Sequence, residues 1–356
     1  MFYIMSKKIS IKIPNLSVPI SNQDYTDHIS IHPELLNTDE TPHNNTYSIL
    51  RSSSALNKTP LVVTCPHAGS YTPPSFLNTL HPDTTLQDIL GRTDMYTDWL
   101  VVNAPSYGAD QIIHTIAPYF INAGRSKLSI APSDVRGGLN RLPYDKDDLY
   151  TSTGRGQGLV AVKNVATGLP IYKEDSVPDE QEIEKRIKEY YTPFHDLVKD
   201  RVLKNLDQFS YNLTLDVHSC SSKSFPDNNA KRVFRPDIMI GNNNGESCSE
   251  KLVLLISNIA ELNHLSVQIN DPFSGGHITR KYSANPQGEY KETPYASLGS
   301  ESIQIEFNRK SCGVSENGLS ISQKDKFENM KIFSDQLLRV VSTYTQNHVN
   351  LPAYNR

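Results

Sequence analysis

The chain of 356 residues is expected to adopt an α/β fold with a mostly parallel sheet, and two features of the sequence indicate this. Short apolar runs recur from residue 60 onward, and segments with a helical pattern separate them. Runs of this length, rich in Val, Ile and Leu, are typical of strands that are buried on both faces of a sheet. The expected strands are LVVT (61–64), QIIHTI (111–116), NLTLDV (212–217), DIMI (237–240), LSVQI (265–269) and SIQIEF (302–307).

Three segments have the periodicity of amphipathic helices. Apolar residues recur three or four positions apart over residues 180–206 and again over residues 327–341, so each segment would bury one face. Between them, Ser247 and Glu250 have the spacing of a capping box ahead of the apolar run LVLLISNIA. We expect helices at these three places, alternating with the strands.

Composition divides the chain into an arm and one domain. Residues 1–58 are rich in Ser, Thr, Asn, His and Pro and predict an irregular N-terminal arm, with one strand at residues 9–13. The α/β pattern then extends over residues 59–350. Two segments within it, residues 136–177 and 270–300, have no clear period and flank polar motifs, so we expect functional loops there.

Charge and cysteine content exclude several classes of protein. The net charge of −4, without a basic run, argues against a dedicated nucleic-acid binder. The four cysteines, none in CxxC spacing, indicate neither a disulfide scaffold nor a cysteine zinc site. No apolar stretch is long enough to span a membrane. We expect a cytoplasmic protein that binds neither nucleic acid nor membrane, while its oligomeric state is open.

Polar side chains occur where the expected strands end. His67 follows the first of them, Asp216 and His218 lie at the end of another, and Glu306 lies in the last. Ligands of open α/β sheets bind beyond the carboxyl ends of the strands. Two imidazoles and a carboxylate are usual ligands of catalytic zinc, and a glutamate can serve as general base. Each motif alone is also compatible with a purely structural role.

Seven motifs in order carry a more specific signal, because together they resemble the N-formylglutamate amidohydrolase family. They are PHAGSYTP (66–73), GRTDMYTDWL (91–100), GLNRLP (138–143), LDVHS (215–219), RPDIMIGN (235–242), FSGGHITRKY (273–282) and IQIEFNR (303–309). The resemblance implies a three-layer α/β/α sandwich of the phosphorylase/hydrolase-like type over residues 59–350, with a mixed sheet. It also implies an amidohydrolase that removes the formyl group of a small acidic amino acid such as N-formylglutamate.

The resemblance further implies one zinc ion per chain, with His67 and His218 as ligands. The related zinc carboxypeptidases would place a glutamate ligand at position 70, but this position is Ser70. The family's Thr-Asp pair makes Asp94 the expected third ligand, and Asp98, one helical turn later, is the alternative. The same donors also suit Fe²⁺, Co²⁺ or Mn²⁺.

The expected catalytic residues are Glu306 and Arg141. Glu306 matches the family's general base, which activates water and protonates the departing amine. Arg141 matches an arginine that holds a substrate carboxylate, a task suited to the two-pronged guanidinium. The expected substrate-binding residues are Asn140, Arg141, Gly275, Gly276, His277 and Arg280.

The chain departs from the family pattern just before Arg141. Gly138 stands where members of the family commonly carry Asp, and the upstream arginine is shifted to Arg136. A different N-acyl amino acid therefore stays open as the substrate. Two other functions also stay open: a carboxypeptidase-like or peptidoglycan-type amidase, and a catalytically inactive member of the fold that binds a metabolite.

Overall fold

A mixed sheet of seven strands lies at the centre of the part of the chain that the computed structural model describes. That part comprises residues 47–50, 58–144, 157–164, 167–223, 234–283, 295 and 299–349. In spatial order the strands are β1 (Tyr47–Leu50), β3 (Asp110–His114), β2 (Leu61–Cys65), β4 (Asn212–Cys220), β7 (Ser300–Asn308), β5 (Ile238–Gly241) and β6 (Val267–Ile269). β1 is antiparallel to β3 and β5 to β7, and the other pairings are parallel. The predicted mixed, mostly parallel sheet is confirmed.

The edge strand β1 lies within residues 1–58, the segment expected to be an irregular arm. It pairs with β3 along its whole length. The sheet therefore begins before residue 59, where the domain was expected to start. The strand expected at residues 9–13 lies outside the described residues.

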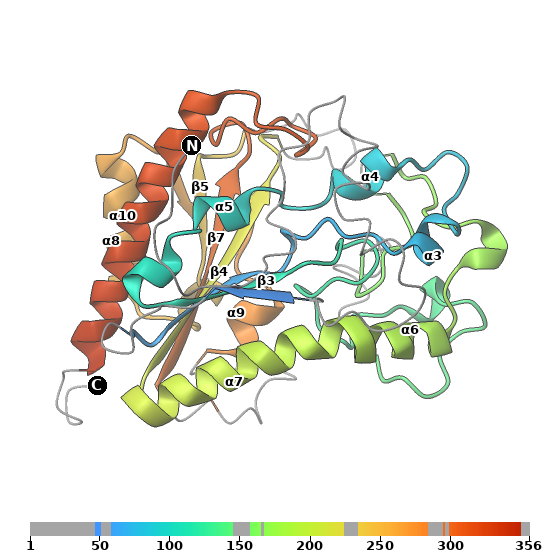
Figure 1. Cartoon of the computed structure of the whole chain (residues 1–356), viewed down its shortest axis with the longest axis horizontal. Coiled ribbons are helices and arrows are strands. Elements are labelled where there is room, and N and C mark those ends of the chain that lie inside the picture. Colours follow the sequence, from blue (N-terminus) through green and yellow to red (C-terminus); the bar gives the residue numbers. More distant parts are fainter. Residues whose placement is uncertain are drawn as a thin grey trace, which may run out of the picture.

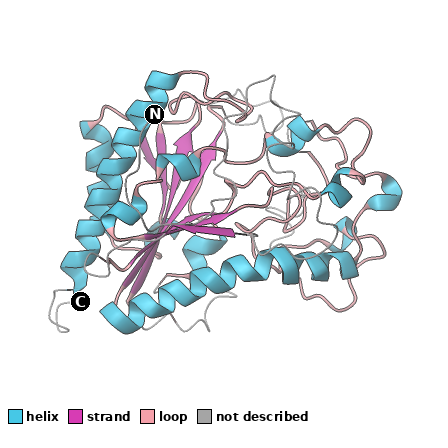
Figure 2. Cartoon of the chain, in the orientation of Figure 1, coloured by secondary structure: helices cyan, strands magenta, loops and turns pink. Residues whose placement is uncertain are grey.

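Helices cover both faces of the sheet, which makes three layers (Figures 1 and 2). α8 (Glu250–Leu262) and α10 (Lys324–Val349) pack side by side on one face, with the short α5 (Thr97–Leu100) beside them. α7 (Thr192–Phe209) and α9 (His277–Lys281) lie on the other face. The predicted α/β/α sandwich is confirmed.

β4 and β7 carry a polar patch of four residues on one face. Parallel pairing places Asp216 opposite Gln304 and His218 opposite Glu306. Because successive side chains of a strand point to opposite faces, these four share one side of the sheet. The residues that alternate with these four along the two strands are apolar and buried in the main core: Leu215, Val217, Ile303 and Ile305. Alternation along two paired strands thus separates the core from a polar face.

The helix expected over residues 180–206 is present, but a π-helical turn divides it. α6 (Glu180–Arg186) is followed by the π turn at Ile187–Tyr191 and then by α7. Such turns are frequent at functional sites, since they change which side chains face inward. The turn places the hydroxyl of Tyr191 2.9 Å from the carbonyl oxygen of Arg125, to which it donates.

The predicted cap of α8 was wrong by two residues. The N-cap is Ser249, whose hydroxyl accepts from the backbone N–H of Leu252 at 3.3 Å. Ser247 does not serve because its carbonyl oxygen accepts from the N–H of Ser302 at the start of β7. This hydrogen bond to β7 keeps Ser247 outside the helix, and residue spacing in the sequence could not predict it.

The remaining described elements lie beside the sheet or in its loops. A second hydrophobic cluster gathers around α3 (Pro74–Leu77), α4 (Leu86–Leu90) and α6, at the right of Figure 1. The 3-10 turns are Ala104–Tyr107, Pro132–Asp134, Glu174–Ser176 and Asn243–Gly245. The segments 136–177 and 270–300 are described only in part, and the second contains α9. Within the described residues, no helix is both long enough and apolar enough to cross a membrane.

Candidate metal and catalytic site

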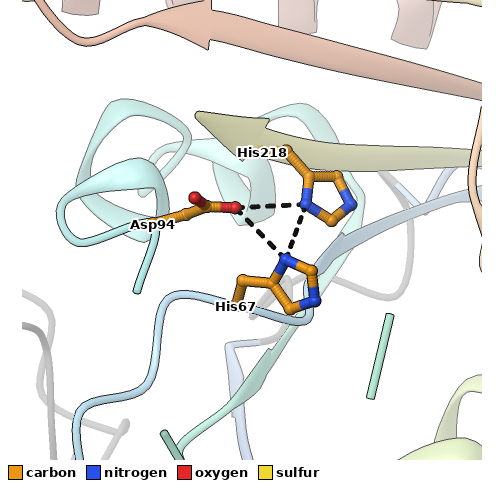
Figure 3. Close-up of side chains that lie close together, drawn as sticks. All are labelled: His67, Asp94 and His218. Atoms are coloured by element: carbon orange, nitrogen blue, oxygen red, sulfur yellow. Dashed lines mark hydrogen bonds and ion pairs between the residues drawn. The ribbon is translucent and has the colours of Figure 1, made fainter. Parts of the chain in front are cut away.

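Three predicted ligands converge where β2 and β4 end (Figure 3). Nδ1 of His218 lies 3.1 Å from Nδ1 of His67 and 3.1 Å from Oδ2 of Asp94. Nδ1 of His67 lies 3.4 Å from the same carboxylate oxygen. The backbone N–H of Asp94 also donates to the carbonyl oxygen of His67 at 2.8 Å, which fixes the two loops together. Asp94 is thus the carboxylate of this cluster, and Asp98 lies in α5, where its carbonyl oxygen accepts from Gln111.

The tautomer of His67 follows from its outer partner. Oδ1 of Asn122 lies 2.7 Å from Nε2 of His67 and also accepts from the N–H of Gly124 at 2.9 Å. An atom that accepts from a backbone N–H is an oxygen, so Nε2 of His67 donates to it. Nδ1 of His67 is then the unprotonated nitrogen, and its lone pair points into the cluster.

His218 is held in the same way, but by a charged partner. Its Nε2 lies 3.1 Å from Oδ2 of Asp216, whose other oxygen accepts from the hydroxyl of Thr64 at 2.8 Å. Burial disfavours the charged imidazole, but the carboxylates of Asp216 and Asp94 outweigh it and raise the pKa of His218 well above its usual value. The same negative field favours a bound cation.

The three inward atoms fit a metal ion by their chemistry and spacing. Two imidazole lone pairs and a carboxylate oxygen this close together repel one another unless a cation or a proton shares them. Zn²⁺ binds such atoms at about 2.0–2.2 Å, which places tetrahedral ligand atoms roughly 3.3 Å apart. The observed separations of 3.1, 3.1 and 3.4 Å agree with that arrangement.

Asp94 is oriented through its second oxygen, Oδ1. The guanidinium of Arg309 lies 3.4 Å from Oδ1 and donates to the carbonyl oxygen of Thr93 at 2.7 Å. The hydroxyl of Ser219 reaches Oδ1 at 3.4 Å. Burial would raise the pKa of Asp94, but the neighbouring His218 and His67 lower it well below its usual range. Oδ2 therefore stays ionised and faces the histidines.

Glu306 lies next to this cluster on the neighbouring strand, opposite His218 in the β4–β7 register. Its side chain is buried, and Oε1 accepts from Nε2 of Gln304 at 2.9 Å. Burial raises the pKa of Glu306 to about 7, with His218 opposing the shift and Asp94 adding to it. A carboxyl group with such a pKa can both take up and release a proton near neutral pH.

The loop that precedes α9 also reaches the polar patch. The N–H of Gly276 donates to Oε1 of Gln304 at 2.6 Å, and Nε2 of the buried His277 lies 3.0 Å from the hydroxyl of Tyr191. Gly275 has a φ of +119°, a conformation that favours glycine. Nε of Arg280, one turn into α9, lies 3.4 Å from the carbonyl oxygen of Gly276.

Asn140 and Arg141 lie against α6. Their backbone N–H groups donate to Oε1 of Glu180 at 3.0 and 2.6 Å. The guanidinium of Arg141 is paired with Glu184 at 2.9 Å, and its side chain is 64% exposed. Within the described part of the chain, the hydrogen bonds and ion pairs of both residues go to α6 and none to the metal ligands.

Several residues of the site were not predicted from the sequence. Asn122, Gln304 and Arg309 each hold a ligand or the predicted base by a side-chain hydrogen bond. Gly124 matters through its lack of a side chain, because a Cβ there would lie 2.4 Å from Nε2 of His67. The signal for Gln304 was present, since polar and apolar residues alternate strictly in IQIEF.

Comparison with known proteins agrees with this architecture. The sequence profile described as N-formylglutamate amidohydrolase matches residues 59–311. The chain belongs to this family. It is accordingly an enzyme, a hydrolase that acts on amide bonds.

Two relatives by sequence and one solved structure resemble the chain over most of its length. The N-formylglutamate deformylase of Pseudomonas aeruginosa is 27% identical over 65% of this chain and 77% of its own. That of Pseudomonas putida is 29% identical over 63% and 74%, respectively. The crystal structure of N-formylglutamate amidohydrolase from Ralstonia eutropha JMP134 superposes with a TM-score of 0.70 at 21% identity, covering 85% of this chain and 99% of that one. The structural match supports the fold.

Proposed function

We propose that this member of the family is a zinc-dependent amidohydrolase that removes the formyl group of N-formylglutamate or a closely similar N-acyl acidic amino acid. One observation carries the proposal: two imidazoles and a carboxylate lie within 3.4 Å of one another beside a buried glutamate. The names of the Pseudomonas relatives supply the substrate class.

His67, Asp94 and His218 would hold the metal. Zn²⁺ at this position would supply Lewis acidity, which polarises a carbonyl group and lowers the pKa of water. The outer bonds to Asn122 and Asp216 fix both rings with Nδ1 facing the metal position, where each Nδ1 would give its lone pair to the ion.

Glu306 is the proposed general base and then the general acid. It takes one proton from the attacking water, whose oxygen forms a bond to the formyl carbon. The C–N bond then breaks, and Glu306 returns the proton to the departing nitrogen. Formate and glutamate are the products. The raised pKa of Glu306 suits both transfers.

The substrate carboxylates require cationic partners. Arg280 lies in α9, directly behind the loop that bonds to Gln304, so we assign one carboxylate to it. Arg141 pairs with Glu180 and Glu184 of α6, and among the described residues its contacts do not reach the metal ligands. From these positions in the fold, we propose that Arg280 contributes more to substrate affinity than Arg141 does.

The first test combines metal analysis with an assay of amine release. The purified protein is measured for zinc, iron, cobalt and manganese, and is incubated with N-formylglutamate, N-formylaspartate, N-acetylglutamate and short peptides. About one zinc per chain, with release from the formylated acidic amino acids, supports the proposal. Turnover of peptides instead would favour a carboxypeptidase-like or peptidoglycan-type amidase, and a protein that neither binds metal nor turns over substrate would favour a metabolite-binding role.

A further inference from the structure

We infer that Gln304 is a positioning residue that fixes the carboxylate of Glu306 and links it to the loop that precedes α9. The inference rests on the proposed role of Glu306 as the base. Gln304 lies two residues before Glu306 on β7, so both side chains leave the same face of the sheet. Its side chain is buried, with 5% of the residue exposed.

The amide of Gln304 has only one orientation that satisfies both of its partners. The backbone N–H of Gly276 can only donate, so the atom that it meets at 2.6 Å is the amide oxygen of Gln304. The NH₂ group then necessarily faces Oε1 of Glu306, at 2.9 Å. One side chain thus accepts from the loop and donates to the base.

This donation matters because Glu306 is removed from water. A buried carboxylate needs hydrogen-bond donors to remain charged and to keep one rotamer. Among the described residues, the hydrogen bond that Glu306 accepts comes from Gln304. With one lone pair of Oε1 engaged by Gln304, Oε2 is the oxygen better placed to take the proton. The geometry points to Gln304 as the residue that selects which oxygen takes it.

The loop on the other side of Gln304 is held at close range. A Cβ on Gly276 would lie 3.3 Å from Oε1 of Gln304 and 3.7 Å from the carbonyl oxygen of Gly124. The next residue, His277, is bonded to Tyr191 of the π turn. The loop therefore contacts the base through Gln304 and the π turn through His277. Movement of this loop would be transmitted to the carboxylate of Glu306.

One substitution removes both bonds of Gln304 at nearly constant length. Gln304→Met offers neither a donor to Glu306 nor a strong acceptor to Gly276. If Gln304 positions Glu306, this variant loses kcat by about 100-fold, the order of effect expected for a misplaced catalytic group. KM and zinc content should stay within about threefold of the unsubstituted enzyme, because ligands and substrate contacts are untouched.

A matched control is available on the opposite side of the sheet. Gln111 on β3 is also buried and donates to the carbonyl oxygen of Asp98 at 2.9 Å. Gln111→Met should lower the melting temperature as Gln304→Met does, yet leave kcat within about threefold. An equal loss of kcat in both variants would mean that the effect of Gln304 is on general stability, and would overturn the inference.

The decisive measurement is a double-mutant cycle with Glu306→Gln. If Gln304 acts through Glu306, adding Gln304→Met to the Glu306→Gln enzyme changes the residual rate by no more than about twofold. A further 100-fold loss would overturn the inference, as would a Gln304→Met enzyme with normal kcat. If Glu306→Gln alone leaves the rate unchanged, the proposed base is wrong and the inference fails with it. The two single variants distinguish this outcome from a failure of the inference about Gln304 alone.

Discussion

β7 carries one glutamate near each end, and the two have opposite surroundings. Glu301, near the start of the strand, accepts from the hydroxyls of Tyr211 and Tyr344, the latter at 2.8 Å, and from the N–H of Ser249. These donors come from the start of β4, from α10 and from the cap of α8, so they tie both helices to the sheet. Glu306, at the other end, accepts from Gln304 beside a cluster of lone pairs.

The difference shows how one strand serves stability and chemistry at once. At the Glu301 end, donors and acceptors are matched within the protein. At the Glu306 end, Nδ1 of His67, Nδ1 of His218 and Oδ2 of Asp94 face one another, and an outer partner orients each side chain. Atoms in this arrangement need a shared proton or a cation between them, so the arrangement suits a bound metal ion. The contrast predicts that substitutions at the two ends will affect different properties.

The largest effect is expected from the ligands themselves. His218→Ala or His67→Ala should reduce the bound metal to near zero and abolish amine release, because two protein ligands do not hold catalytic zinc tightly. Elemental analysis of dialysed protein measures the metal. A variant that retains about one zinc per chain would show that the site lies elsewhere.

The Glu306→Gln variant should still bind the metal but should lose most of its catalytic rate. Amine release from N-formylglutamate should fall on the order of 10²–10⁴-fold, since the amide cannot accept the proton of water. Zinc content and melting temperature are measured in parallel, and both should match the unsubstituted protein. Survival of activity would exclude Glu306 as the base.

Arg309→Gln tests the outer hold on Asp94. The substitution removes the guanidinium contact to Oδ1 of Asp94, and the affinity for Zn²⁺ should fall about 10–100-fold. Competition with a chromophoric chelator measures this without reference to activity. Arg201 on α7 is a matched control, because it pairs with Asp110 rather than with a ligand. An equal loss of affinity in Arg201→Gln would remove the special role of Arg309.

The two candidate anchors for substrate carboxylates can be ranked directly. Arg280→Ala should raise KM for N-formylglutamate about 10-fold, the order expected for one lost charge-assisted hydrogen bond. Arg141→Ala should have the smaller effect, because its contacts go to α6, whereas Arg280 lies beside the loop that bonds to Gln304. The comparison substrates are two analogues, one with the α-carboxylate and one with the side-chain carboxylate replaced by a carboxamide. If a variant loses as much on both analogues as on the diacid, its assigned contact with a carboxylate is wrong.

The smallest effect on activity is expected at the opposite end of β7. Glu301→Gln weakens the bonds from the two tyrosine hydroxyls, so the free energy of unfolding should fall by about 1–3 kcal/mol. The rate on N-formylglutamate at a temperature well below unfolding should stay near normal. A loss of kcat comparable to that of Glu306→Gln would break the contrast between the two ends.

Patterns of short range explain which parts of this fold could be predicted. The apolar composition of the runs that form β2, β4 and β7 is enough to predict that these strands are buried. Because side chains alternate between the two faces of a strand, Asp216 and His218 could be predicted to share a face. His67, Asp94 and His218 stood in motifs whose order resembles the family's, so their convergence could be expected although they lie far apart in sequence.

Residues that act through distant partners could not be found in this way. Asn122 meets His67 across 55 positions, and Arg309 meets Asp94 across 215. The residues that neighbour an asparagine or an arginine in the sequence do not predict its hydrogen-bond partner elsewhere in the chain. The same limit applies to Arg141, whose ion pair with Glu184 depends on where α6 packs. Local spacing also misplaced the cap of α8, because a bond to β7 decided it.

The contact between Gly124 and His67 has a consequence for how this enzyme tolerates genetic change. A Cβ at position 124 would come within 2.4 Å of the imidazole, closer than any allowed contact, so every replacement, alanine included, must displace His67. In a saturation-mutagenesis screen, Gly124 should therefore behave like a metal ligand although it has no functional group. Sequence variation around the His67–Asp94–His218 cluster is then limited by the missing side chain of Gly124 as well as by the cluster residues themselves.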